Sequence, residues 1–268
     1  MPPSTATILT TLTRRPTGTI AHLTISRPTK LNALNTPLLS QLPTTLQSLT
    51  SQTPDLLCVI LTGAGNKSFI GGADIAEMAA LDSPASARAF ISRVSEACRS
   101  LRECPVPVIG RVNGYALGAG LEVAASCDFR VASRRAVFGM PEVRVGIPSV
   151  VEAALLPGLI GWGRTRQLLM LGENISADEA LRWGLVEKVV EPEALDDAVE
   201  QWVCQLEKNG PLAVRRQKAL MRTWENVSLD EAIQAGVTAF GESFGTREGE
   251  VSEPMRMLGA FFKDKSKI

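Results

Sequence analysis

Short apolar runs, each closed by a turn, mark the first half of the chain. Residues 19–25 are rich in β-branched side chains, and residues 56–62 are apolar without interruption, as in a strand covered on both faces. The second run stops at the glycine-rich turn 63–66. The same reasoning predicts two further strands, at residues 106–109 and 129–132.

A helical pattern is inserted between these strands. Ser83 and Pro84 are residue types typical of an N-cap and a first helical position. Seven apolar residues then keep one face at helical spacing: Ala87, Phe90, Ile91, Val94, Ala97, Cys98 and Leu101. The predicted helix must end by Cys104, because a proline follows at position 105. Strands alternating with helices indicate an α/β fold.

From residue 176 onward the sequence turns helical. Capping-box motifs at 176–179 and 228–231 each predict the start of a helix, and no strand is expected after Val190. Between the two motifs lies one amphipathic stripe: Leu195, Ala198, Val199, Trp202, Val203 and Leu206. Such stripes need a partner surface, either the core of this chain or another subunit.

Length and charge limit the classes of function. The chain has 268 residues, which fits one large domain or one domain with a helical appendage. Its 28 Lys and Arg residues balance 28 Asp and Glu residues, which argues against a nucleic-acid binder. No window approaches the ~20 apolar residues of a membrane span. We therefore expect neither a nucleic acid nor a membrane as a partner.

Cysteine and histidine usage leaves Asp and Glu as the candidate groups for proton transfer. None of the five cysteines forms a CxxC pair, which favours buried thiols in a reducing compartment over a zinc site or a disulfide framework. His22 is the only histidine and lies in a predicted strand. A His-rich metal site is therefore not expected, and proton transfer has to depend on Asp or Glu.

Two glycine-rich segments follow predicted strands, at residues 68–75 and 113–122. Small residues allow a ligand to approach the backbone closely. The second segment leads into an apolar run that can start a helix, whose first N–H groups stabilise negative charge. Two such donors converging on one oxygen would form an oxyanion hole, although similar glycine patterns also occur in ordinary turns.

Two glutamates accompany these segments. Glu122 lies in the apolar run 120–125, and Glu142 lies at what looks like the end of a strand within 138–143. Either could be a structurally paired carboxylate. Together, beside candidate oxyanion donors, they resemble the acid and base that move protons at neutral pH, because burial raises the pKa of a carboxyl group.

These segments resemble the enoyl-CoA hydratase/isomerase (crotonase) family, in order from about residue 20 to residue 263. The matching stretches are 62–78, 113–128 and 138–148, with shorter ones at 27–34, 180–186 and 210–214. The resemblance implies an α/β fold, a crotonase-type spiral of ββα units with a C-terminal helical region. It also implies an acyl-CoA-binding core over residues 1–200 and a helical oligomerisation region over residues 201–268.

The function that the resemblance implies is that of an enoyl-CoA hydratase, which adds water to a 2-enoyl-CoA thioester or removes it. Glu122 and Glu142 match the two acids that share this water, with Glu142 as the main acid/base. The N–H groups of Ala73 and Ala119 match the donors to the thioester oxygen. The implied substrate and coenzyme A contacts are Lys30, Leu31, Ala33, Gly72, Ala73, Asp74, Ile75, Gly118 and Ala119. No metal, and no cofactor beyond the coenzyme A of the substrate, is implied.

Several alternatives stay open within the family: an enoyl-CoA isomerase, a specialised acyl-CoA dehydratase, or a non-catalytic member that binds RNA. The resemblance also implies homotrimers, often paired into hexamers. One departure concerns residues 149–152, Ser-Val-Val-Glu, where the family usually has glycines. Glu152 is then either a helix-start residue or a group that reads the substrate.

The last three residues bear on the compartment. Ser266, Lys267 and Ile268 are close to the Ser-Lys-Leu address of peroxisomal proteins. We therefore expect a peroxisomal location, and otherwise the cytoplasm or another reducing compartment.

Overall fold

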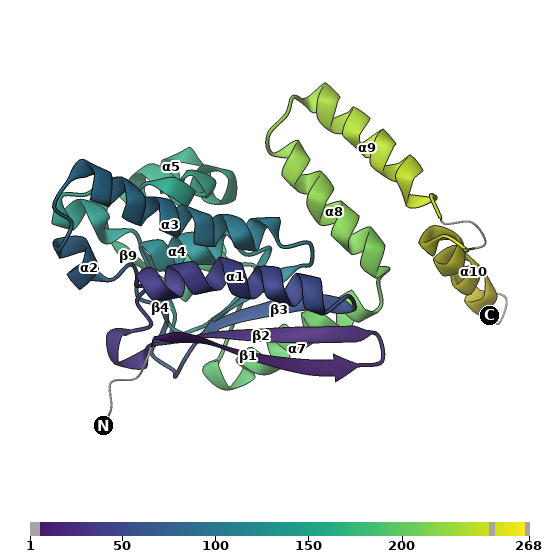
Figure 1. Ribbon diagram of the computed structural model, residues 1–268, viewed down its shortest axis with the longest axis horizontal. Coiled ribbons are helices and arrows are strands. Elements are labelled where there is room, and N and C mark those ends of the chain that lie inside the picture. Colours follow the sequence, from purple (N-terminus) through teal and green to yellow (C-terminus); the bar gives the residue numbers. More distant parts are fainter. Residues whose placement is uncertain (1–5, 247–249, 266–268) are drawn as a thin grey trace.

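Two β-sheets form the framework of the protein. The computed structural model describes residues 6–246 and 250–265 (Figure 1). The larger sheet has the strand order β1 (Thr7–Arg15), β2 (Gly18–Ser26), β3 (Leu56–Gly63), β5 (Val108–Val112), β7 (Phe129–Ser133) and β10 (Lys188–Val190). β1 pairs with β2 antiparallel, and the other neighbours in this sheet are parallel. The smaller sheet has the order β4 (Ser68–Ile70), β6 (Tyr115–Leu117), β8 (Val137–Gly139) and β9 (Asn174–Ser176).

Successive strands from β3 to β8 join the larger and the smaller sheet in turn. β3, β5 and β7 are neighbours in the larger sheet, and the strands that follow them, β4, β6 and β8, are neighbours in the smaller one. A helix comes after each pair of strands, so the chain advances as a spiral of ββα units. The helices are α1 (Thr36–Gln52), α2 (Ile75–Ala79), α3 (Pro84–Glu103), α4 (Ala119–Ala125), α5 (Leu156–Leu171), α6 (Ala177–Trp183), α7 (Leu195–Glu207), α8 (Pro211–Trp224), α9 (Leu229–Ser243) and α10 (Glu253–Lys265).

Most of the elements predicted from the sequence are confirmed. The four predicted strands are β2, β3, β5 and β7, and the predicted helix is α3, capped by the side chain of Ser83. β5 begins two residues later than predicted, at Val108, because Pro107 has no N–H to donate to a ladder. β1 was not predicted at all. Six of its nine side chains are exposed at the sheet edge, so it lacks the apolar alternation of a half-buried strand.

Apolar cores lie on both faces of the larger sheet. One core packs α1 and α3 against the sheet, and the other packs α7 against the opposite face, as Figure 1 shows. The predicted stripe of residues 195–206 therefore has its partner within this chain. Residue 200, where the sequence suggested a boundary between core and appendage, lies in the middle of α7.

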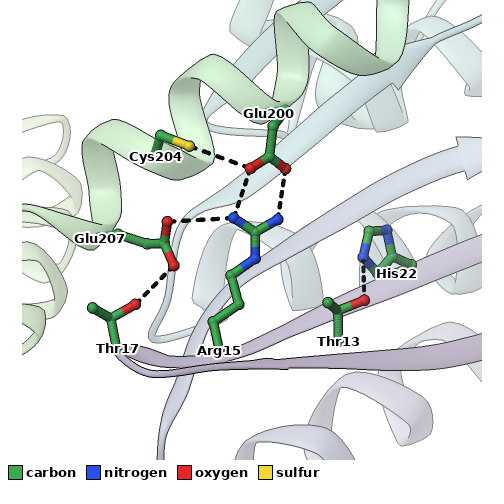
Figure 2. A network of polar contacts seen from close by, with 7 residues as sticks. All are labelled: Thr13, Arg15, Thr17, His22, Glu200, Cys204 and Glu207. Carbon is green, nitrogen blue, oxygen red and sulfur yellow. Dashed lines mark hydrogen bonds and ion pairs between the residues drawn. The ribbon is translucent and has the colours of Figure 1, made fainter.

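A polar network also joins α7 to the first hairpin, across 185 residues of sequence (Figure 2). The guanidinium of Arg15 donates to both carboxylate oxygens of Glu200, at 2.6 and 2.7 Å, and to Glu207 at 3.3 Å. Thr17 donates to the same Glu207 at 2.8 Å. His22 lies beside this network, half-buried and 3.3 Å from the hydroxyl of Thr13. The sole histidine thus belongs to the sheet, as its sequence context suggested.

The helices that follow α7, namely α8, α9 and α10, extend away from this body (Figure 1). α8 and α9 form an antiparallel pair, and α9 has no buried residue. None of the helices in the described residues is both long and apolar enough to span a membrane. The tripeptide 266–268 lies outside the described residues, so the peroxisomal address stays a prediction.

Candidate active site

The first glycine-rich segment forms a loop between β4 and α2. Leu34 pairs with Ala73 in an isolated β-bridge. The N–H of Leu34 donates to the carbonyl of Gly72, and the N–H of Asp74 donates to the carbonyl of Leu34, both at 2.8 Å. Gly72 has a φ of +121°, a conformation that glycine adopts without a steric penalty. None of the hydrogen bonds among the described residues uses the N–H of Ala73. The loop is fixed on both sides of Ala73 and leaves this donor available.

Asp74 holds the same loop in place through its side chain. One carboxylate oxygen caps α2 by accepting from the N–H groups of Ala76 and Glu77, at 2.8 and 3.1 Å. The other oxygen forms an ion pair with Arg27. Burial alone would raise the pKa of this carboxyl, but the Arg27 and backbone hydrogen bonds outweigh it and lower the pKa below its usual value. Asp74 is therefore a fixed structural anion, a role that its implied coenzyme A contact did not suggest.

The turn at residues 27–33 lies against this loop. Leu31 and Asn32 both have positive φ, and the carbonyl of Leu31 accepts from the N–H of Gly71 at 2.8 Å. Asn32 is fully buried, and its amide donates to the carbonyls of Ala64 and Ser68 at 3.0 and 2.8 Å. The structure thus brings the predicted contacts Lys30, Leu31 and Ala33 next to Gly72 and Ala73.

The second glycine-rich segment connects β6 to α4. Gly118 has a φ of +52° and donates to the carbonyl of Gly139 at 2.9 Å, which ties the loop to β8. Ala119 is the first residue of α4, and its N–H is also unused among the hydrogen bonds of the described part of the chain. A side chain at Gly72 would reach 3.3 Å from the carbonyl of Leu117. The two glycine-rich loops therefore lie side by side.

Glu122 lies one turn into α4, a helix whose seven residues are all buried. Its Oε1 accepts from the N–H of Ala153 at 3.1 Å. Desolvation raises the pKa of Glu122 to about 8, with further increases from the charges of Glu142 and Glu152, and the Ala153 bond only partly offsets this. At neutral pH Glu122 is therefore mostly protonated.

Glu142 lies across from this helix, in the 3-10 helix η2 (Pro141–Val145) that follows β8. The sequence suggested the end of a strand, but β8 stops at Gly139. Oε1 of Glu142 lies 2.6 Å from the position that a Cβ on Gly118 would occupy, so any side chain at Gly118 would collide with it. Oε2 accepts from the hydroxyl of Ser149 at 2.9 Å. Half-buried Glu142 thus covers the residue that precedes Ala119.

The predicted site residues therefore come together from four separate segments. Ile75 is 79% exposed and Lys30 is also exposed, so these two lie at the outer edge of the site. The sequence did not indicate Ser149 or Ala153 as partners of the acids, because neither residue type signals a role without its neighbours in space. A cavity of about 680 Å³ lies elsewhere, between α8 and the ends of α4 and α5, and includes none of the predicted residues. Among the described residues, no group of three or more His, Cys, Asp or Glu could hold a metal ion.

Comparison with known proteins decides the family. Residues 15–261 match the family model described as enoyl-CoA hydratase/isomerase. The chain belongs to this family. A short-chain-enoyl-CoA hydratase of Clostridium acetobutylicum is 41% identical over 232 residues, which cover 86% of this chain and 88% of that protein. A crotonyl-CoA hydratase of Syntrophomonas wolfei is also 41% identical, over 85% of this chain and 88% of its own length.

Solved structures of the family share the fold. The crystal structure of an enoyl-CoA hydratase from Bacillus anthracis superposes with a TM-score of 0.86 at 31% identity, covering 95% of this chain and 96% of that chain. One from Mycobacterium smegmatis gives a TM-score of 0.87 at 29% identity, over 96% of both chains. The crotonase-type fold expected from the sequence is therefore confirmed, and the chain is a member of an enzyme family.

Proposed function

We propose that the protein is an enoyl-CoA hydratase, which adds water to the double bond of a 2-enoyl-CoA thioester or catalyses the reverse dehydration. The observation that carries this proposal is the placement of two carboxyl groups at one loop, with Glu122 inside α4 and Oε1 of Glu142 against Gly118. Relatives at 41% identity that bear the names of short-chain-enoyl-CoA and crotonyl-CoA hydratases support it.

In the proposed mechanism the thioester oxygen accepts hydrogen bonds from the N–H groups of Ala73 and Ala119. These donors stabilise the negative charge that develops on this oxygen when water attacks the β-carbon. The turn at Lys30, Leu31 and Ala33, in which Lys30 and Leu31 are exposed, lies beside this loop and would meet the coenzyme A portion, which is part of the substrate.

Glu122 and Glu142 hold the attacking water between them. Glu122, protonated at neutral pH, donates a hydrogen bond that orients the water oxygen. Glu142 takes a proton from the water as its oxygen bonds to the β-carbon, and a proton from Glu142 goes to the α-carbon. The sum is one hydroxyl and one hydrogen added across the double bond, with both acids returned to their starting state.

The test replaces each acid by its amide, which has almost the same volume. Glu122→Gln and Glu142→Gln should each lower kcat for hydration of a short 2-enoyl-CoA by roughly 10²–10⁴-fold. Because both residues act on one water, the double variant should be scarcely slower than the worse single variant. Binding of a non-reactive acyl-CoA should survive in all three, and Glu96→Gln, an exposed site on α3, is the matched control.

The outcomes separate the alternatives. A wild-type hydration rate in Glu142→Gln would reject the hydratase assignment. If Glu122→Gln alone leaves the rate unchanged, an isomerase with a single acid would be favoured. Product analysis with 2-enoyl-CoA and 3-enoyl-CoA distinguishes these two activities directly. A relative from Salmonella arizonae, 35% identical, bears the name carnitinyl-CoA dehydratase, so hydroxyacyl-CoA substrates belong in the same screen. Salt-dependent RNA binding without turnover would instead support a non-catalytic member.

We also propose that the protein assembles into homotrimers or hexamers. The support lies in α9, where Leu229, Ile233, Val237 and Phe240 are between 54% and 76% exposed and recur at helical spacing. A helix with no buried residue gains little stability from its own chain, so this apolar face needs a partner surface.

A further inference from the structure

Both proposed acids accept hydrogen bonds from the same short segment, residues 149–153. The hydroxyl of Ser149 donates to Oε2 of Glu142 at 2.9 Å, and the N–H of Ala153 donates to Oε1 of Glu122 at 3.1 Å. Each acid thus has one oxygen fixed by this segment. For Glu142 the other oxygen, Oε1, is the one that lies against Gly118, next to the proposed thioester donor Ala119.

The segment has an unusual backbone that neighbouring contacts must stabilise. Val151 has a φ of +42°, in the left-handed region that β-branched residues rarely adopt. Strain of this kind persists only where the surrounding structure over-determines it, and it clusters at functional sites. The 3-10 helix η3 (Val151–Leu155) starts at this residue, and its third residue, Ala153, supplies the N–H to Glu122. The conformation at Val151 therefore decides where this donor points.

Glu152 attaches the segment to α3. Glu152 is only 7% exposed, and its Oε1 accepts from the hydroxyl of Ser95 at 3.2 Å. Its Oε2 is buried and has no partner among the described residues. Burial raises the pKa of Glu152, and the Ser95 bond and the charge of Arg102 only partly oppose this. The hydrogen bond from Ser95 therefore joins this buried carboxyl to α3.

We propose that Ser149 is a positioning residue that orients Glu142, and that the 149–153 segment, anchored by Glu152 to Ser95, places both acids together. The proposal rests on the hydratase function proposed above and deepens it. One segment fixes one oxygen of each acid, so the second oxygens are left to contact water and substrate. Sequence neighbours thereby set the relative geometry of two acids that lie 20 residues apart in the chain.

Removal of the Ser149 hydroxyl should impair chemistry more than binding. Ser149→Ala frees Glu142 to rotate, so we expect kcat to fall about tenfold with KM nearly unchanged, as for loss of a hydrogen bond to a charged group. Ser149→Thr keeps a hydroxyl and should restore most of this rate. Ser100→Ala is the matched control, because Ser100 is also half-buried and its hydroxyl donates, within the described part of the chain, to the carbonyl of Ala97 in its own helix.

A double-mutant cycle separates positioning from general destabilisation. In a Glu142→Gln background, Ser149→Ala should slow the remaining hydration by less than twofold, because the group that it orients no longer transfers protons. The proposal would be overturned if Ser149→Ala slowed hydration equally in the wild-type and Glu142→Gln backgrounds. A wild-type kcat in the single variant Ser149→Ala would also overturn it. Wild-type hydration by Glu142→Gln would instead reject the proposed function itself, so the two failures are distinguishable.

The anchor at Glu152 is tested by a second pair of variants. Glu152→Gln retains an uncharged acceptor for Ser95, whereas Glu152→Ala removes it. We expect Glu152→Ala to lower kcat about tenfold, and Glu152→Gln to recover most of the loss, with native mass and circular dichroism as controls for folding. Equal kcat values in the two variants, whether high or low, would contradict the anchoring role.

Discussion

At the scale of single residues, the cost of burying Glu122 explains its protonation. All its neighbours in α4 are buried, and a carboxylate loses solvation there with no cationic partner among the residues that the structure describes. Its pKa of about 8 in the folded protein compares with an ordinary value of 4.5. The neutral form is thereby favoured in the folded state, which makes stability depend on pH.

We predict that Glu122 destabilises the protein as the pH rises. A raised pKa in the folded state gives stability that is fully present below the unfolded pKa and is lost as pH rises through the folded value. Glu122→Gln cannot ionise, so its free energy of unfolding relative to wild type should increase from about pH 5 to about pH 9, by an amount on the order of 2–4 kcal/mol. Its melting temperature relative to wild type should therefore also rise over this pH range. Glu96→Gln should show no such trend, and a pH-independent difference for Glu122→Gln would contradict the assignment.

The backbone role proposed for Ala119 gives a second prediction at this scale. Ala119→Gly retains the N–H and should keep much of the activity, whereas Ala119→Val crowds the proposed oxyanion hole and should abolish turnover. Ala125→Val, at the other end of the same buried helix, controls for overpacking, which typically costs about 1–3 kcal/mol. Equal hydration rates for Ala119→Val and wild type would remove Ala119 from the site.

At the scale of elements, one buried lysine fastens α8 to the body of the protein. Lys218 is only 5% exposed, and its ammonium donates to the carbonyls of Leu101 and Val106, at 3.1 and 3.0 Å. It also pairs with Asp128 at 2.6 Å, and Asp128 in turn accepts from the N–H of Val108 at 2.7 Å. The same lysine therefore holds the end of α3, the start of β5 and the approach to β7.

We predict that Lys218→Met is strongly destabilising. It leaves the partly buried carboxylate of Asp128 without its cation, and breaking a buried pair in this way costs about 3–5 kcal/mol. Denaturant unfolding should show the loss as a lower midpoint. Lys208→Met, at an exposed position after α7, is the matched control, and similar midpoints for the two variants would refute the role of Lys218.

At the scale of the whole molecule, α9 and α10 contribute apolar surface rather than core. α9 and α10 expose large side chains, including Phe240 at 69% and Phe261 at 54%. Figure 1 shows both helices extending away from the two sheets. This surface lies on a different part of the chain from the acids, so assembly and chemistry can be tested separately.

Light scattering at micromolar concentration should give a native mass of three or six times the 28.7 kDa of the chain. Phe240→Asp places a charge on the apolar face of α9 and should shift the protein toward smaller species. Gln234→Asp, on the same helix outside the apolar stripe, should not. A wild-type monomer would contradict the proposed assembly.

Much of the fold was accessible from local patterns. β-branched runs, apolar helical spacing and caps are short-range properties, so β2, β3, β7 and α3 could be predicted from the residues themselves. The ordered set of glycine-rich segments also specified the family and the positions of Glu122 and Glu142. The roles proposed for these residues came with the family resemblance, and they stay proposals until the variants are measured.

Tertiary structure decided what depends on contacts between distant residues. β1 is recognisable only through its pairing with β2, because an edge strand needs no apolar alternation. The stripe of α7 and the face of α9 look alike in sequence, yet among the described residues only the stripe of α7 is buried in an apolar core. Likewise, the residue type of Ser149 carries no signal, and its bond to Glu142 exists because a turn brings the hydroxyl to the carboxylate. The sequence by itself determined which residues can do chemistry, and folding determined which of them meet.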